Sequence, residues 1–223
     1  MIQATRSSSA PVALSQATDG CWRDREVKAR LHQDFLGKCY LCEGPLRLGE
    51  LEVDHRVPRN DPMGLSRSFD WANLFPAHHD CNNRRPRRYP KDGLLFPDID
   101  PVEARLVQQL DTDGNRLRPV FLARDPADAT ARSTAEELQR IHVVADPAGQ
   151  GADKADDLRS AIKERFDEVL QVAWRFERAR NMKGAAAVET MLFEKKLEAL
   201  LSRRSPYTML LRSQFPEYAH LFD

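Results

Sequence analysis

Two pairs of soft metal ligands stand at the two ends of one stretch of the chain. Cys39 and Cys42 are separated by two residues, and His78 and Cys81 repeat that spacing. A Cys-x-x-Cys turn can bring two thiolates to one ion at Zn–S distances of about 2.3 Å, and a second pair completes a tetrahedral set. Because such a set has no open position, it is typical of structural zinc. The sequence therefore predicts a structural Zn²⁺ held by Cys39, Cys42, His78 and Cys81.

This ligand set has two alternatives. His79 could take the place of His78, although the two-residue spacing favours His78. Without a metal, Cys39 and Cys42 would be buried apolar residues and His78 would lie in a surface loop. Disulfides are disfavoured because cysteine spacing of this kind is typical of metal sites in cytosolic proteins. Cys21 stands apart and is expected to be a free, inert cysteine.

An Asp-His pair lies between the two predicted zinc half-sites. The imidazole of His55 has an ordinary pKa near neutrality, so it can take a proton from water at working pH. The carboxylate of Asp54 offers the oxygen ligands that Mg²⁺ prefers. Taken alone, the pair would more often be a surface feature. Beside two zinc half-sites, the sequence favours a catalytic site with Asp54 on a divalent ion and His55 on water.

The order C-Y-L-C, V-D-H-R-V-P, W-A-N-L and H-H-D-C-N-N resembles the HNH endonuclease family. The resemblance implies the same roles for Asp54 and His55. It matches Asn73 to the family's middle asparagine, which would brace the loop and orient His55. It matches Asn82, directly after the last zinc ligand, to the second protein ligand of the catalytic ion; its neighbour Asn83 fits that position less well. The chain is then an H-N-N variant.

The HNH resemblance also implies a reaction. The expected activity is hydrolysis of DNA phosphodiester bonds assisted by Mg²⁺ or Mn²⁺, with 5′-phosphate and 3′-hydroxyl products. A carboxamide ligand such as Asn82 suits these hard ions better than zinc. The expected fold class is α+β, with a ββα-metal nuclease core.

Apolar periodicity predicts the elements around these residues. Val27, Leu31 and Phe35 favour a helix, and Gly-bounded alternation favours two short strands. The full set is a helix over 23–36, two strands within 46–57, a loop at 61–64, a helix within 71–85, a hairpin over 104–122, a helix capped by Thr134 and Glu137, a loop over 145–156, and helices over 156–180, 185–202 and 205–211. Three parts follow: a flexible lead-in (1–22), a nuclease domain (23–100), and a hairpin with helices for partner docking (101–223).

The charge of the chain is balanced overall but not along its length. The 223 residues contain 34 Lys and Arg and 34 Asp and Glu. The stretch 21–91 holds 14 basic and 10 acidic residues, and the stretch 92–223 holds 19 and 23. A basic half with an acidic half suits a module that faces nucleic acid joined to one that faces a partner. No stretch resembles a signal peptide or reaches the length of a membrane span, so the sequence predicts a cytoplasmic protein with no membrane contact.

A basic run follows the second zinc half-site directly. It holds five positive charges in eight residues: Arg84, Arg85, Arg87, Arg88 and Lys91. A charge run is usually a solvated segment. At this position, contact with the phosphates of a nucleic acid is favoured, and such binding would be independent of sequence and sensitive to salt.

Short matches elsewhere in the chain resemble one HNH subgroup, the PtuB-like nucleases of Septu and retron-linked antiphage systems. They include Pro11-x-x-Leu14, Trp22 with Val27-Lys28, Trp71-x-Asn73-Leu74, Gly93-Leu94-Leu95-x-Pro97 and Ser205-Pro206-Tyr207-x-Met209-Leu210-x-Arg212. This resemblance implies a partner ATPase of the ABC/AAA type. Two other hypotheses stay open: a stand-alone restriction or mobile-element nuclease, and a non-catalytic zinc-stabilised module that binds nucleic acid. A homodimer with two active sites is a further option.

Overall fold

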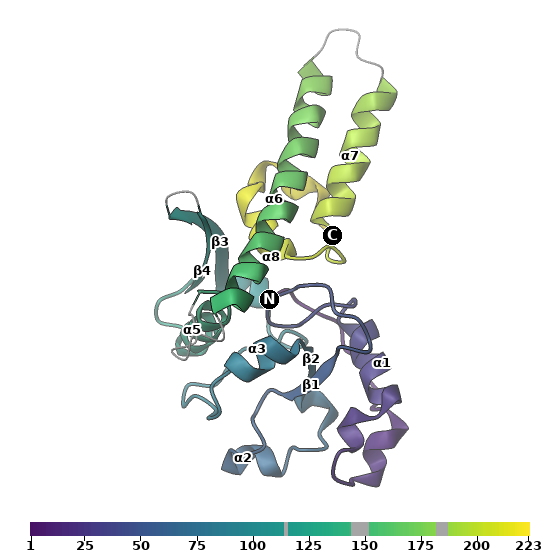
Figure 1. The fold of residues 1–223 in the computed structure, drawn as a ribbon, viewed down its shortest axis with the longest axis vertical. Coiled ribbons are helices and arrows are strands. Elements are labelled where there is room, and N and C mark those ends of the chain that lie inside the picture. The colour runs from purple at the N-terminus through teal and green to yellow at the C-terminus, as the bar shows by residue number, and fades with distance from the viewer. Residues whose placement is uncertain (114–115, 144–151, 182–186) are drawn as a thin grey trace.

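The computed structural model describes residues 1–113, 116–143, 152–181 and 187–223 as a mixed α+β protein (Figure 1). The elements are η1 (Val12–Gln16), η2 (Cys21–Arg23), α1 (Arg25–Asp34), β1 (Glu52–His55), α2 (Pro62–Leu65), η3 (Trp71–Asn73), β2 (Leu74–Ala77), α3 (His79–Arg84), α4 (Val102–Arg105), β3 (Leu106–Asp113), β4 (Arg116–Ala123), α5 (Ala129–Val143), α6 (Ala152–Asn181), α7 (Ala187–Leu201), α8 (Thr208–Gln214) and η4 (Pro216–Leu221). None of the described helices combines the length and the apolar composition that crossing a bilayer requires.

The unit that positions the site is a strand–strand–helix arrangement. β1 pairs antiparallel with β2, and α3 begins two residues after β2 ends. The predicted order is therefore present, but the second strand lies at 74–77 and not within 46–57. The helix predicted within 71–85, with Cys81 to Arg85 on its first turns, is present as α3. The residues before it form η3 and β2, because Pro76 cannot donate an intrahelical hydrogen bond and would clash with the preceding turn of a helix. All four residues of β2 are buried, which an amphipathic surface helix would not allow.

The first residues of the chain are packed against the core, which corrects the prediction of a flexible lead-in over 1–22. The guanidinium of Arg6 lies 4.6 Å from the centre of the Phe75 ring. It donates hydrogen bonds of 2.9 Å to the backbone oxygens of Trp71 and Leu74. A Ser/Ala-rich composition gives no sign of such contacts, because their acceptors are backbone carbonyls some 65 residues away.

The predicted hairpin and helix after it are present, with one change in the helix start. β3 and β4 pair along their whole length, and the turn residues Gly114 and Asn115 lie outside the described part. The capping box of Thr134 and Glu137 is wrong, since both residues lie inside α5. Asp128 caps this helix instead, by accepting a 3.0 Å hydrogen bond from the backbone nitrogen of Ala131.

Smaller corrections concern two predicted loops. Asp61 starts a short helix, α2, by accepting a hydrogen bond from the backbone nitrogen of Met63, so 61–64 is not an irregular loop. The predicted loop at 145–156 falls mainly on residues outside the described part, and α6 already begins at Ala152. α1, α6 and α7 match the helices predicted over 23–36, 156–180 and 185–202.

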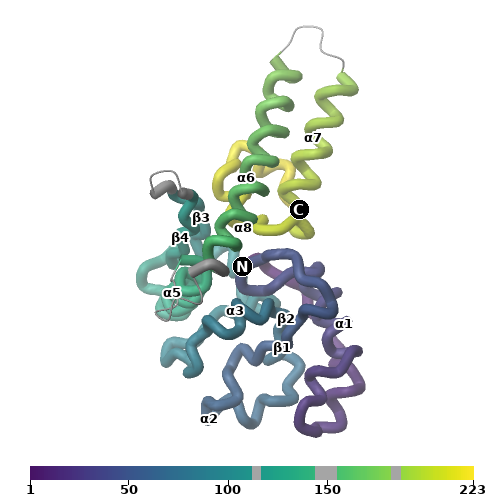
Figure 2. The backbone as a smooth tube through the Cα atoms, viewed as in Figure 1, coloured from purple at the N-terminus to yellow at the C-terminus, as the bar shows by residue number. Residues whose placement is uncertain are grey.

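Two hydrophobic cores lie along α6. The larger core joins both sheets, α1, α5 and the first part of α6, where Ile162 is fully buried. The smaller core lies between the rest of α6, from Val169 onward, and α7, α8 and η4. α6 and α7 form a hairpin that projects away from the sheets (Figures 1 and 2). The predicted boundary at residue 100 therefore does not coincide with an edge of the larger core.

Candidate zinc cluster and active site

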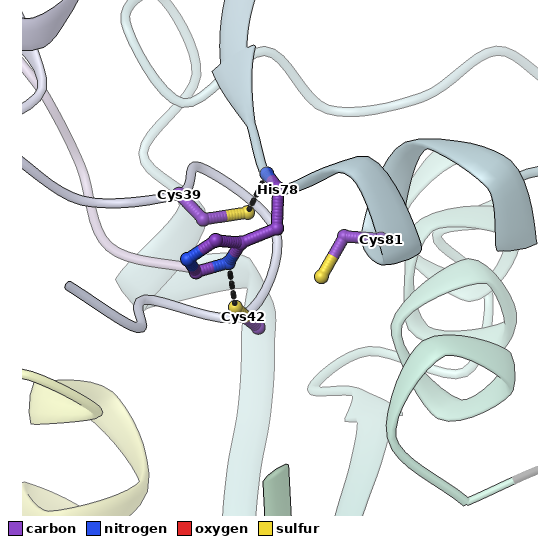
Figure 3. A group of neighbouring side chains, drawn as sticks. All are labelled: Cys39, Cys42, His78 and Cys81. Atoms are coloured by element: carbon purple, nitrogen blue, oxygen red, sulfur yellow. Dashed lines mark hydrogen bonds between the residues drawn. The ribbon is translucent and has the colours of Figure 1, made fainter. Parts of the chain in front are cut away.

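Four side chains form a cluster that fits a structural zinc ion, and we call it the zinc cluster: Cys39, Cys42, His78 and Cys81 (Figure 3). Their ligand atoms all lie within 4.8 Å of one another. Two sulfurs that share a tetrahedral zinc at 2.3 Å are about 3.8 Å apart, so the cluster needs little contraction to hold the ion. The two cysteines of the first pair lie on one tight turn, and Cys81 reaches them from α3. This is the predicted ligand set.

The orientation of His78 also suits zinc. Its Nε2 lies 3.0 Å from the backbone oxygen of Pro45, while its Nδ1 lies 3.3 Å from the sulfur of Cys42. A carbonyl that accepts one ring N–H fixes the tautomer and leaves the other nitrogen for the metal. His79, the alternative ligand, is largely exposed and bonds to Glu52, so the structure favours His78.

Gly44 closes the turn beneath the first cysteine pair. Its backbone nitrogen donates to the sulfur of Cys42 at 3.4 Å. A Cβ atom at this position would lie 3.1 Å from Cε1 of His78 and 3.3 Å from the sulfur of Cys42. Because the backbone at residue 44 approaches the ligands this closely, a residue without a Cβ atom is required there.

A segment near residue 207 covers the outer side of this turn. The backbone nitrogen of Tyr207 donates to the backbone oxygen of Glu43, and that of Met209 donates to the Glu43 carboxylate, both at 3.3 Å. Lys38 reaches back to the backbone oxygen of Ser205 at 3.1 Å. Because Tyr207 takes a φ of 56° to make this contact, the helix predicted over 205–211 starts only at residue 208, as α8.

His55 lies at the end of β1 with one ring nitrogen occupied. Its Nε2 is 3.0 Å from the backbone oxygen of Ser68, and its ring meets the edge of Trp22 at 5.1 Å between centres. The carbonyl can only accept, so Nε2 carries the proton and Nδ1 keeps its lone pair when the ring is neutral. Burial lowers the pKa of His55, which favours this neutral form.

Asp54 is buried with its two carboxylate oxygens in different situations. Oδ2 accepts hydrogen bonds of 2.5 Å from the Tyr40 hydroxyl and from the Arg85 guanidinium. Within the described ranges, no hydrogen bond falls on Oδ1. One oxygen is thus fixed by the protein and the other is left for a further ligand.

The carboxamide of Asn82 is oriented by a residue of β1. Its Nδ2 donates to the carboxylate of Glu52 at 3.0 Å, which leaves its Oδ1 as the unused acceptor. Glu52 also accepts from His79, and Asn83 bonds to the same histidine. Oxygen donors from Asp54 and Asn82 fit Mg²⁺ or Mn²⁺, which bind carboxylate and carbonyl oxygens and retain several waters.

These groups meet at one open pocket of about 270 Å³. Its lining comprises Val53, Asp54, His55, Pro58, Arg59, Asn60, Asn82, Asn83, Arg85, Pro86 and Arg87. The structure therefore brings the predicted Asp54, His55 and Asn82 to one solvent-accessible surface.

Asn73 does not line the pocket and is fully buried. Its Oδ1 accepts from the Val57 backbone nitrogen at 2.7 Å, and its Nδ2 donates to the backbone oxygens of Val57 and Arg67. These bonds fix both ends of the loop that delivers Ser68 to His55. This position suits the predicted bracing role, although Asn73 makes no described bond to the His55 ring.

Residues 39–88 match the family model of HNH endonucleases. We refer to this stretch as the HNH segment. It supports nuclease activity and nucleic-acid binding at the level of the family. Comparisons of the chain with curated proteins and with solved structures gave no match.

The basic run at the end of the HNH segment is divided between interior and surface. Arg85 is buried and bonds to Asp54 and Glu137, which corrects its prediction as a phosphate contact. Arg84 donates to the backbone oxygen of Ile141 at 2.7 Å. The exposed members are Arg87, Arg88 and Lys91. Of the five basic residues, Arg85 and Arg87 line the pocket.

Several residues at the site were not predicted from the sequence. Arg59 lines the pocket and stacks on Trp22 at 4.2 Å, and Glu52 orients Asn82. Glu137 could have been found, because it lies between Thr134 and Ile141 on the buried stripe of α5. A carboxylate on an apolar stripe requires a buried partner. Nothing local identifies Arg59 or Glu52.

Proposed function

We propose that this protein is a metal-dependent endonuclease that hydrolyses phosphodiester bonds of DNA. The observation that carries the proposal is the lining of the pocket: it joins His55, whose Nδ1 keeps its lone pair, with the two oxygen-bearing side chains of Asp54 and Asn82. Zinc bound by the cluster at the start of the same helix, α3, would hold that helix in place.

In this proposal His55 is the general base. Its Nε2–H is held by the Ser68 carbonyl, so Nδ1 takes the proton from the attacking water. Asp54 and Asn82 would hold a Mg²⁺ or Mn²⁺ ion. When bound, that ion would stabilise negative charge on the phosphoryl and leaving oxygens.

The cationic residues at the pocket would hold the substrate. Both Arg59 and Arg87 line the pocket; Arg59 stacks on the Trp22 ring, and Arg87 is exposed. Arginine suits this task because its fork of N–H donors matches phosphate oxygens. Arg88 and Lys91 would extend the contact along the backbone of the nucleic acid.

The biological setting that we propose is antiphage defence, with an ATPase partner of the ABC/AAA type. Support comes from the short motifs shared with PtuB-like nucleases. The projecting α6–α7 hairpin also carries exposed apolar side chains, namely Leu170, Trp174, Val188, Met191 and Leu192. A stand-alone nuclease and a non-catalytic binding module are the alternatives that an experiment must separate.

The test is cleavage of plasmid DNA with Mg²⁺ or Mn²⁺, using wild type and His55→Ala, each with and without a candidate partner ATPase of the ABC/AAA type. Cutting by wild type that is lost in His55→Ala supports the nuclease. Cutting only with the ATPase present supports the two-component system, and cutting without it supports a stand-alone enzyme. DNA binding without cutting in any combination contradicts the proposed activity, and parallel RNA and single-stranded substrates show whether the substrate class is wrong instead.

A further inference from the structure

Four charged side chains form a charge cluster that includes two residues of the pocket lining, Asp54 and Arg85, together with Arg56 and Glu137. None is more than 8% exposed. Arg85 lies between the two carboxylates, with Nη1 at 2.5 Å from Asp54 and Nε at 2.8 Å from Glu137. Arg56 contacts the other oxygen of Glu137 at 2.5 Å. The cluster holds two positive and two negative charges and is neutral as a whole.

Arg85 is fixed from several directions. Besides the two carboxylates, it donates to the backbone oxygens of His55 at 3.1 Å and Arg56 at 2.9 Å. Glu137 takes the Nε edge of the guanidinium, so only Nη1 is directed at Asp54. That contact falls on Oδ2 of Asp54, the oxygen that also accepts from Tyr40.

The position of Glu137 decides how Asp54 can be used. With Glu137 present, each arginine has a carboxylate partner, and Asp54 needs to share only one oxygen. Without its charge, two buried guanidiniums would face a single carboxylate, and an uncompensated buried charge is costly. The favoured response is a bidentate Arg85–Asp54 pair, which occupies both carboxylate oxygens.

We propose that Glu137 is a positioning residue for the divalent ion of the pocket, acting through Arg85 to keep Oδ1 of Asp54 available as a ligand. This inference rests on the proposed function. It makes α5 part of the metal site, although the HNH segment ends 49 residues before Glu137. Cutting the chain after the HNH segment would then remove a component of the active site.

The test is Mn²⁺ binding, measured by titration calorimetry on the zinc-loaded full chain. The variant is Glu137→Gln, which keeps the shape and removes the charge. Glu136→Gln is the matched control, because Glu136 is the exposed neighbour on the same helix. We expect Glu137→Gln to bind Mn²⁺ at least tenfold more weakly with zinc content unchanged, and Glu136→Gln to bind like wild type.

A second variant guards against a folding defect. Arg56→Met with Glu137→Gln removes one charge of each sign, so the cluster is neutral again while Arg85 still lacks its second carboxylate. We expect this protein to fold, to retain zinc and to bind Mn²⁺ weakly.

Wild-type Mn²⁺ affinity in either variant overturns the inference while leaving the proposed function intact. Loss of zinc and fold in both also overturns it, because Glu137 would then serve the fold alone. Absence of Mn²⁺ binding by wild type contradicts the proposed function itself.

Discussion

Two sites with different ligand chemistry lie at the two ends of α3. At its start, His78 and Cys81 complete a cluster of three sulfurs and one nitrogen with no open position. Within the next turn, Asn82 faces an open pocket of oxygen donors, and Arg85 anchors a buried charge cluster. The first suits an ion that holds the fold, and the second suits an ion that exchanges ligands with water and substrate.

The two sites also differ in where their supports come from. The zinc ligands all belong to the HNH segment, and the turn at Gly44 shapes half of the cluster. The pocket depends on Glu137 of α5, which pairs with Arg85 of the lining. A compact metal cluster can therefore be specified by a short motif, whereas the electrostatics of the pocket need the rest of the fold.

The largest effect expected from this comparison is at the zinc end. Cys81→Ser removes a thiolate ligand, and structural zinc supplies on the order of 10 kcal/mol of folding free energy in small zinc domains. We expect zinc content to fall to background and cooperative thermal unfolding to be lost, together with any nuclease activity. The measurement is metal analysis alongside a thermal melt.

Cys21→Ser is the control for that experiment, because Cys21 is a free cysteine outside the zinc cluster. Cys21→Ser should keep the zinc content and the melting temperature of wild type. If Cys81→Ser keeps the wild-type melting temperature, zinc is not the support of α3 and the contrast between the two ends is wrong.

The same contrast explains how far the sequence could be interpreted. Cys39, Cys42, His78 and Cys81 were found because spacing along the chain reports directly on tetrahedral geometry. Long helices such as α6 were found because a 3.6-residue apolar period persists over many turns. Asp54, His55 and Asn82 were predicted through their order relative to these ligands, and the structure places the three at one pocket.

The remainder could not be predicted, for reasons of distance and length. β2 has only four residues, too few for a period to show, and it pairs with a strand some twenty residues earlier. Arg85 was interpreted as a phosphate contact because its run of neighbours is basic. Its buried partners Asp54 and Glu137 lie 31 and 52 residues away. Burial of a charge is a property of the tertiary fold and not of the local sequence.

At the pocket we expect a large loss of cleavage rate with little change in the stability of the fold. His55→Ala removes the proposed base, and general base catalysis contributes typically 10²–10⁴-fold to rate. Cleavage should fall by about that factor, with zinc content and melting temperature close to wild type. Initial rates of plasmid nicking measure the loss.

His220→Ala serves as the control, because His220 is exposed and lies in η4, remote from both sites in sequence. It should cut like wild type. Full activity in His55→Ala would assign the base to another residue and remove the main argument for the pocket as an active site.

A smaller effect is expected on the stability of the fold in acid, and it comes from a histidine on α5. His142 on this helix is buried against Phe121, and burial lowers its pKa from 6.5 to about 4. The unfolded chain therefore takes up the proton first as pH falls below 6.5. Stability present above that pH is lost between 6.5 and 4, by at most about 3 kcal/mol.

The measurement is the free energy of unfolding in denaturant at several pH values, for wild type and for His142→Leu. Other groups, including the zinc ligands, titrate alike in both proteins, so the difference isolates His142. That difference should change by up to the stated amount between pH 6.5 and 4 and stay constant above 6.5. A difference that is independent of pH would show that His142 titrates normally in the fold.

The smallest expected effect separates surface charge from buried charge within the basic run. Arg87 is exposed at the pocket, whereas Arg85, two residues earlier, is buried and paired within the charge cluster. Arg87→Gln should weaken DNA binding a few-fold and reduce the slope of log affinity against log salt by about one, because one phosphate contact releases about one counterion. Zinc content and stability should not change.

The measurement is binding of a catalytically inactive His55→Ala protein to duplex DNA over a range of salt, with and without Arg87→Gln. An unchanged salt slope would place the phosphate path elsewhere, with Arg59 as the next residue to test.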